Sequence, residues 1–167
     1  MIENNSRDVH AQYVEGVKSW LEARKNRDDY LLAINSSDPR LHRTDQFAKQ
    51  LVSMVPPGAT IVDLGFGPEG REMDDAISLG HEKGVRVYGA ELVIQNIYST
   101  SRNPRFIQNN THQLLGRLVQ ADIISGIPFR DASFDGIILS TVIQHIPKTL
   151  FFNRVAPDIV RLLKHEG

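Results

Sequence analysis

Residues 63–70 of this chain read Asp-Leu-Gly-Phe-Gly-Pro-Glu-Gly, and this stretch decides the fold. It overlaps a short apolar run at residues 60–64, which predicts a strand, and it leads into residues 69–83, which predict a helix closed by Gly84. A strand that enters a helix through glycines reverses tightly and leaves its backbone N–H groups uncovered by side chains. Because N–H groups at a helix start favour an anionic group, the stretch predicts a ligand-binding turn.

The alternation of strands and helices continues towards the C-terminus. Residues 85–90 and 133–140 predict a second and a fourth strand, and the weaker run at residues 118–121 predicts a third. Residues 93–116 predict helix and loop, and residues 148–164 predict a final apolar helix. Strands that alternate with helices predict an α/β fold with a doubly wound, mostly parallel sheet.

The N-terminal part of the chain is polar, with apolar residues at helical spacing. It predicts a helical cover over residues 1–43, with a helix near 8–25, followed by a core over residues 44–167. Thr44 is predicted to cap the first helix of the core, and residues 56–58 to end it. The face that this helix buries is predicted to consist of Phe47, Leu51, Val52 and Val55.

Composition excludes several classes of site. The chain has no cysteine, which rules out disulfides, a zinc–thiolate site and a cysteine nucleophile. Lys plus Arg number 19 against 20 Asp plus Glu, so no excess charge argues for nucleic acid or a membrane as a partner. Every pair of His or carboxylate residues at helix-ligand spacing is better explained otherwise, so a metal site is not expected. There is also no signal peptide and no apolar stretch that spans a bilayer. The expectation is a cytoplasmic protein without a metal site.

The glycines themselves support two interpretations. Their pattern, Gly65-x-Gly67-x-x-Gly70, fits the dinucleotide fingerprint, and Glu91 follows roughly 20 residues later, where an acid bonds ribose hydroxyls. A nicotinamide-dependent oxidoreductase and a methyltransferase share these two features. Asp63 favours the methyltransferase, because a buried carboxylate suits the ammonium group of a methionine moiety and would repel a pyrophosphate. No Tyr-x-x-x-Lys pair is present for the proton chemistry of an oxidoreductase.

Together with three later segments, these residues resemble the class I S-adenosylmethionine-dependent methyltransferase family, in its small-molecule type. Residues 63–70 match the family's first motif, acid-x-Gly-x-Gly-x-Gly, with the third glycine one residue late. Residues 128–135 (PFRDASFD) are similar to the lead-in to the fourth strand, residues 140–146 (STVIQHI) to the segment after it, and residues 160–167 (VRLLKHEG) to the helix end before a fifth strand. The resemblance covers residues 58–167 and implies a Rossmann-like fold.

The resemblance also implies S-adenosyl-L-methionine as the cofactor. In the family an acid at the end of the second strand binds both ribose hydroxyls, which Glu91 matches, and an acid after the third strand binds the adenine amino group, which Asp122 matches. The backbone N–H of the next residue, Ile123, would meet a ring nitrogen. His145 is the candidate general base where the acceptor loses a proton, and its alternative role is packing at a helix start. The full set of predicted cofactor-binding residues is Asp63, Gly65, Phe66, Gly67, Gly70, Glu91, Leu92, Asp122, Ile123 and Ser140.

The family sheet has seven strands in the order 3-2-1-4-5-7-6, and this chain ends before the fifth. The fourth strand is then expected at an exposed edge, although Ile137, Ile138 and Leu139 are typical of a strand buried on both faces. We therefore expect a truncated domain, or a second copy or partner chain that completes the sheet. Asp135 is interpreted as a residue that orients the fourth strand rather than one that binds a ligand.

Two functions follow from these expectations. The first is methyl transfer from S-adenosylmethionine to a small-molecule acceptor. The Asn/Asp-Pro-Pro-Tyr/Phe signature of many enzymes that methylate amino groups of nucleic acids is absent after the fourth strand, which favours a small molecule. The second is a non-catalytic methyltransferase-like module that binds a partner.

Overall fold

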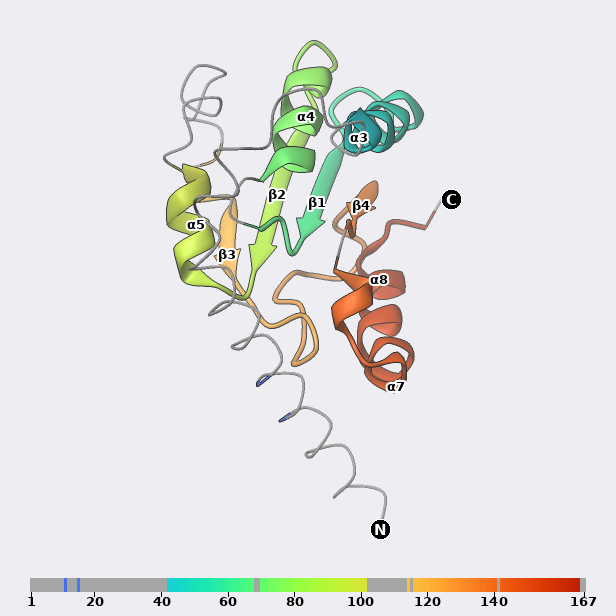
Figure 1. Cartoon of the computed structure of the whole chain (residues 1–167). Coiled ribbons are helices and arrows are strands. Elements are labelled where there is room, and N and C mark those ends of the chain that lie inside the picture. Colours follow the sequence, from blue (N-terminus) through green and yellow to red (C-terminus); the bar gives the residue numbers. More distant parts are fainter. Residues whose placement is uncertain are drawn as a thin grey trace.

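A computed structural model of the chain describes residues 11, 15, 42–67, 70–101, 114, 116–140 and 142–165 (Figure 1). Most of the predicted N-terminal cover, including the helix near 8–25, lies outside the described residues. Pro68 and Glu69 of the glycine stretch also lie outside them.

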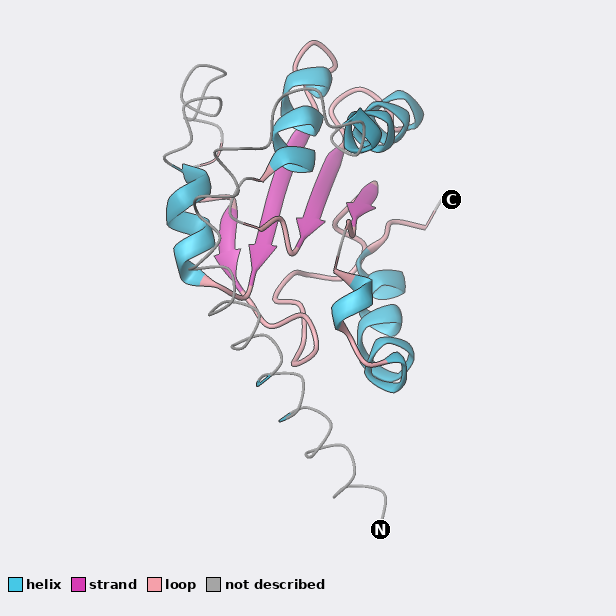
Figure 2. Ribbon diagram, in the orientation of Figure 1, coloured by secondary structure: helices cyan, strands magenta, loops and turns pink. Residues whose placement is uncertain are grey.

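In the described part of the chain, the core is a four-stranded parallel sheet (Figure 2). Its strands are β1 (Thr60–Leu64), β2 (Arg86–Glu91), β3 (Leu118–Gln120) and β4 (Gly136–Ile138), and they lie in the order β3-β2-β1-β4. Asp63 of β1 lies opposite both Gly89 of β2 and Ile138 of β4. The predicted parallel, doubly wound sheet is therefore confirmed, and all of its strands end at one edge.

Helices cover both faces of this sheet (Figure 1). One face packs on α3 (His42–Met54) and α4 (Arg71–Gly80), and α5 (Ile94–Ser101) lies beside β3. The other face packs on a helical stretch made of α7 (Lys148–Leu150), η3 (Phe151–Val155) and α8 (Ala156–Leu162). Burial on both faces explains why β1 reads as a nearly continuous apolar run. The first face buries Ala48, Val52, Ile61, Met73, Ala76 and Val87, and the second buries Val62, Leu64, Ala90, Leu150, Val155 and Leu162.

The helix α3 corrects two predictions. It begins at His42, so Thr44 lies inside its first turn and is not the N-cap. Phe47 was expected on the buried face but is 67% exposed. The buried stripe instead runs through Ala48, Val52 and Val55, at spacings of four and three residues, which turns Phe47 to the flank.

The helix α4 is shorter than the predicted span of residues 69–83. It ends at Gly80, whose carbonyl accepts hydrogen bonds from the backbone N–H groups of Lys83 (3.1 Å) and Val85 (3.0 Å). This turn places the Lys83 side chain at the end of α3, where Nζ donates to the carbonyls of Val52 (2.7 Å) and Val55 (2.8 Å). The turn therefore provides the C-terminal cap of a neighbouring helix, which a longer α4 would not.

The final helix, predicted as one stretch over residues 148–164, contains a π-helical turn. The backbone N–H of Ala156 donates to the carbonyl of Phe151, five residues back, and this wider turn is η3. Pro157 follows directly, and proline has no N–H for a carbonyl four residues earlier. A widened turn before a proline keeps the stretch helical where an ordinary helix would break.

Among the residues that the structure describes, the outer side of the chain is paired just before β4, and β4 itself is not paired on that side. Phe134 forms a parallel bridge with Leu163, and its carbonyl accepts the Lys164 N–H at 2.9 Å. Asp135 lies between these elements, because Oδ2 accepts the Thr60 N–H and Lys164 Nζ, each at 2.7 Å. These bonds confirm the interpretation that Asp135 orients the strand. As expected, β4 lies at the edge of the sheet in the described part of the chain, and residues 137–139 have no strand partner on this side there, although they are apolar enough for an interior strand.

Candidate functional site

The carboxyl ends of the parallel strands bring most of the predicted site residues to one edge of the sheet. Asp63 is the penultimate residue of β1 and Glu91 is the last residue of β2. Asp122 and Ser140 each follow two residues after β3 and β4. Such an edge is where open α/β sheets bind ligands.

Gly65 is held in a place that only glycine fits. Its φ is 77°, in the left-handed region, and a Cβ built on it would lie 2.5 Å from Cγ2 of Val142. Its N–H donates to the carbonyl of Ala90 at 2.7 Å, which ties the turn to β2. The close contact also places the segment after β4 directly over the glycine turn. The sequence analysis identified the segment of residues 140–146 but did not single out Val142 within it.

The Glu91 carboxylate joins the glycine turn to the end of β2. Oε2 accepts the N–H of Gly67 at 2.8 Å, and Oε1 accepts the N–H of Val93 at 3.0 Å. On the other side of the same glycine, Oγ1 of Thr100 donates to the Gly67 carbonyl at 3.2 Å. Each carboxylate oxygen has two lone pairs, so Glu91 keeps acceptor capacity for hydroxyl donors. The fully buried Thr100 comes from the polar helix α5, and no sequence signal pointed to it.

Asp63 is a buried carboxyl group with one oxygen unused. It is fully buried, and Oδ2 has no hydrogen-bond partner among the described residues. Burial raises the pKa of the Asp63 carboxyl well above its ordinary value, and the nearby Glu72 and Glu91 raise it further. A buried acid that has an oxygen without a partner and two acidic neighbours is unfavourable by itself, and a bound cation would relieve it.

Phe66 and Gly70 serve the turn through packing and backbone. The Phe66 ring is buried against Gly89, where an added Cβ would lie 2.7 Å from the ring. Phe66 therefore offers a ligand its backbone but not its side chain. Gly70 precedes α4 with a φ of 53°, and its carbonyl accepts the N–H of Asp74 at 2.9 Å.

Asp122 closes a turn directly after β3. Oδ1 accepts the N–H of Ile124 at 3.0 Å and Oδ2 accepts the hydroxyl of Ser125 at 2.8 Å. The next side chain, Ile123, is buried in the core beneath the turn. The carbonyl of Leu92 accepts Nε2 of Gln120 at 3.1 Å, which holds the ends of β2 and β3 together.

His145, the candidate base, lies in the 3₁₀ turn η2 (Ile143–His145). Its side chain is exposed, and its Nε2 lies 3.4 Å from Nε2 of Gln144. The turn begins one residue after Val142, so it is connected to the glycine turn through the contact at Gly65. Within the described part of the chain, no group of three or more His, Asp or Glu side chains is arranged to hold a metal ion. No helix described there has both the length and the apolar character needed to cross a membrane.

Comparison with known proteins gives one family match. The sequence profile described as "Methyltransferase domain" matches residues 62–167, more than half of the chain. No curated protein sequence matches the chain significantly.

Several solved structures resemble the chain. One is phosphoethanolamine N-methyltransferase 1 of Haemonchus contortus, solved in complex with phosphoethanolamine and S-adenosylhomocysteine. Its TM-score is 0.65 and its sequence identity is 16%, and the match covers 95% of this chain and 31% of that chain. A putative sarcosine dimethylglycine methyltransferase of Galdieria sulphuraria has a TM-score of 0.55 and 22% identity, over 75% of this chain and 43% of that chain. A geranyl diphosphate C-methyltransferase of Streptomyces coelicolor has a TM-score of 0.53 and 19% identity, also over 75% and 43%. At these identities the likeness shows the fold alone, and the chain spans less than half the length of each of the three.

Proposed function

This chain belongs to the methyltransferase domain family, and from that premise we propose that it binds S-adenosylmethionine and takes part in methyl transfer to a small-molecule acceptor. The observation that carries the proposal is the buried Asp63 carboxyl, whose Oδ2 has no partner within the described residues. It lies beside the glycine turn and the Glu91 carboxylate, so a cation and a neighbouring pair of hydroxyl groups would both find acceptors.

The chemistry of these three acceptors fits this cofactor. Asp63 would take the ammonium group, because a positive charge removes the cost of a buried, unpartnered carboxylate. Glu91 would accept the ribose hydroxyls through lone pairs that the Gly67 and Val93 N–H groups leave unused. Asp122, whose oxygens each accept one bond from its own turn, would accept the adenine amino group.

Bound at this edge, S-adenosylmethionine supplies an activated methyl group on a sulfonium sulfur. The protein's own part is to orient the acceptor and exclude water. Val142 and the η2 turn lie over the glycine turn and would form one wall for the acceptor. Where the acceptor must lose a proton, His145 on that turn would hold it. The near balance of acidic and basic residues supports a small molecule rather than nucleic acid as the acceptor.

A second candidate function is a non-catalytic methyltransferase-like module completed by a partner or a second copy. The outer edge of β4 favours it, because in the described part of the chain β4 itself pairs only with β1, and the bridge at Phe134 lies before the strand begins. An unpaired strand edge is a ready surface for another strand. Size-exclusion chromatography with light scattering would find a stable dimer or complex if this function were correct.

The test of the leading proposal is calorimetric titration of the chain with S-adenosylmethionine, S-adenosylhomocysteine and NAD. We expect both adenosyl ligands to bind and NAD not to bind. A Glu91→Ala variant should lose the binding, because it removes the hydroxyl acceptors and the bond to Gly67. Binding of NAD in preference, or no adenosyl binding by a folded chain, would contradict the proposal.

A further inference from the structure

The loop between β3 and β4 has no helix or strand to satisfy its backbone. Residues 121–135 connect the two strands, and buried N–H and carbonyl groups there need partners from elsewhere. The first of them, Asp122 and Ile123, are the residues proposed to meet the adenine ring.

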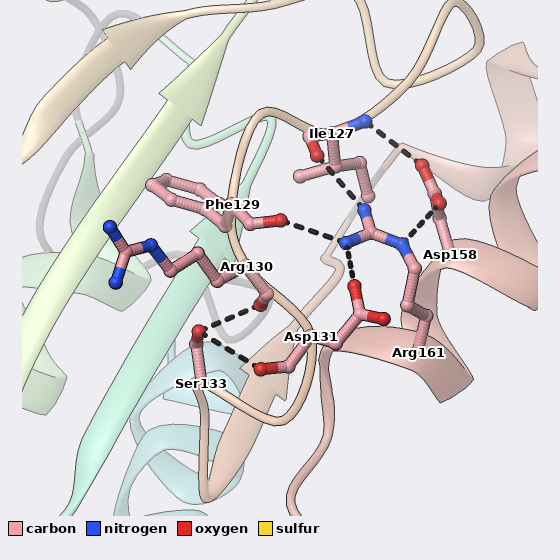
Figure 3. A network of polar contacts seen from close by, with 7 residues as sticks. All are labelled: Ile127, Phe129, Arg130, Asp131, Ser133, Asp158 and Arg161. Carbon is pink, nitrogen blue, oxygen red and sulfur yellow. Dashed lines mark hydrogen bonds and ion pairs between the residues drawn. The ribbon is translucent and has the colours of Figure 1, made fainter.

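Two side chains of α8 provide those partners (Figure 3). Arg161 donates from Nη2 to the carbonyl of Ile127 at 3.0 Å and from Nη1 to the carbonyl of Phe129 at 2.8 Å. Asp158 accepts the N–H of Ile127 through Oδ2 at 2.9 Å, and its Oδ1 accepts Nε of Arg161 at 2.9 Å. The same Nη1 also donates to Oδ1 of Asp131 at 2.7 Å. We call the Arg161 and Asp158 side chains the clasp. Because one planar guanidinium makes bonds from three nitrogens, a lysine could not reproduce them.

The opposite side of the loop is held by aromatic packing. Phe129 lies edge-on to Phe134, with ring centroids 5.0 Å apart, and to Tyr88 of β2, with centroids 6.3 Å apart. Ile127 is almost completely buried. The loop is therefore fixed between α8 on one side and β2 on the other.

This fixation extends to the turn at Asp122. That turn is anchored at its start, where the N–H of Ala121 donates to the carbonyl of Glu91 at 3.0 Å. It ends at Ser125, two residues before Ile127. Gly126 lies between them with a φ of 128°, a conformation that side chains rarely adopt. The clasp bonds both the N–H and the carbonyl of Ile127, the residue directly after Gly126, and so fixes the far side of this glycine.

We propose that the clasp of Arg161 and Asp158 positions the adenosine half of the cofactor site, by holding the loop that carries Asp122 and Ile123. This inference rests on the proposed function. Arg161 touches no proposed ligand atom, so it is a positioning residue. Its guanidinium fixes the position of the Asp122 turn relative to Glu91. It thereby fixes the distance between the Asp122 carboxylate, which would accept from adenine, and the Glu91 carboxylate, which would accept from the ribose.

The experiment compares Arg161→Met with a matched control, Lys164→Met, by calorimetric titration with S-adenosylhomocysteine. Lys164 also forms an ion pair at 2.7 Å, with Asp135, but that pair lies where β4 begins and not at the ligand edge. Arg161→Met should weaken binding by about tenfold or more, which is the effect expected if a displaced Asp122 loses one charge-assisted hydrogen bond to the ligand. Lys164→Met should lower the unfolding temperature without changing the dissociation constant.

A double-mutant cycle separates positioning from general stability. If Arg161 acts through Asp122, Arg161→Met should weaken binding less in an Asp122→Asn background than in the wild-type chain. An equal fold loss in both backgrounds would overturn the inference. Should Arg161→Met not fold, Arg161→Lys keeps the charge but not the fork, and an intermediate, Asp122-dependent loss is expected.

The titration of the wild-type chain distinguishes this inference from the proposed function. If the wild-type chain binds S-adenosylhomocysteine and Arg161→Met binds it equally well, the positioning role is wrong while the function stands. If the folded wild-type chain binds neither adenosyl ligand, the proposed function is wrong, and the inference is wrong with it.

Discussion

Two aspartates at opposite edges of the same sheet have opposite surroundings. Asp63, at the carboxyl end of β1, is fully buried, and its Oδ2 has no partner among the described residues. Asp135, beside the start of β1, bonds the Thr60 N–H and the Lys164 ammonium. Burial raises the pKa of Asp135, but the bonds to Lys164 and Thr60 outweigh it, so its pKa lies below the ordinary value. For Asp63 every contribution raises the pKa. One edge satisfies its polar groups within the chain, and the other leaves an acceptor that a ligand must satisfy.

The largest expected effect tests the crowding at the ligand edge. Gly65 and Gly58 share a φ of 77°, but only Gly65 has a close neighbour, Val142. Gly65→Ala should destabilise the chain by about 3 kcal/mol, from backbone strain plus overpacking against a stiff valine. Gly58→Ala should cost only about 1 kcal/mol, because nothing lies within 4 Å of its added Cβ. Urea unfolding measures the free energy of unfolding of both variants. Equal losses of stability in Gly65→Ala and Gly58→Ala would show that the packing around the two glycines does not differ.

The next effect tests the unused acceptor. Asp63→Asn keeps the shape but removes the charge, so it should weaken S-adenosylhomocysteine binding by about 10- to 100-fold. The unliganded variant should be at least as stable as the wild-type chain, since a buried, unpartnered carboxylate is costly. Calorimetric titration and thermal unfolding measure the two quantities. A loss of stability with unchanged affinity would mean that Asp63 belongs to the core and not to the site.

The smallest effect is a difference in pH dependence. The raised pKa of Asp63 gives stability that is present below the ordinary carboxyl pKa and is lost as pH rises through the folded-state value. The lowered pKa of Asp135 gives stability that is present above the ordinary value and is lost as pH falls through the folded-state value. Unfolding curves from about pH 3 to 8 should therefore change slope oppositely in Asp63→Asn and Asp135→Asn. The Asp135→Asn effect should be at most about 1 kcal/mol, because solvent screens the half-exposed Lys164. If the pH dependence of stability changed in the same direction in both variants, the contrast between the surroundings of Asp63 and Asp135 would be contradicted.

Local sequence was a reliable guide wherever one short segment contained the whole signal. The strand at residues 60–64 was predicted with the bounds that it has, because an apolar run between turn residues needs no distant information. The contacts of helix faces were less predictable. Phe47 fits a helical stripe as well as Ala48 does, and only the position of the sheet decides which of them is buried. The π-helical turn before Pro157 was also missed, because apolar spacing alone does not reveal the extra residue.

The sequence by itself determined the parallel sheet and the family, and it indicated the acids of the candidate site, because each of these acids lies at or just after the end of a strand that the sequence predicts. Only the tertiary structure decided which groups support them. Val142 covers Gly65, Thr100 holds the Gly67 carbonyl, and Arg161 holds a loop some 30 residues earlier. These partners come from other elements, and their spacing along the chain follows no helical or strand period. Val142 and Thr100 reach the glycine turn because parallel strands end at one edge and bring the segments that follow them together there.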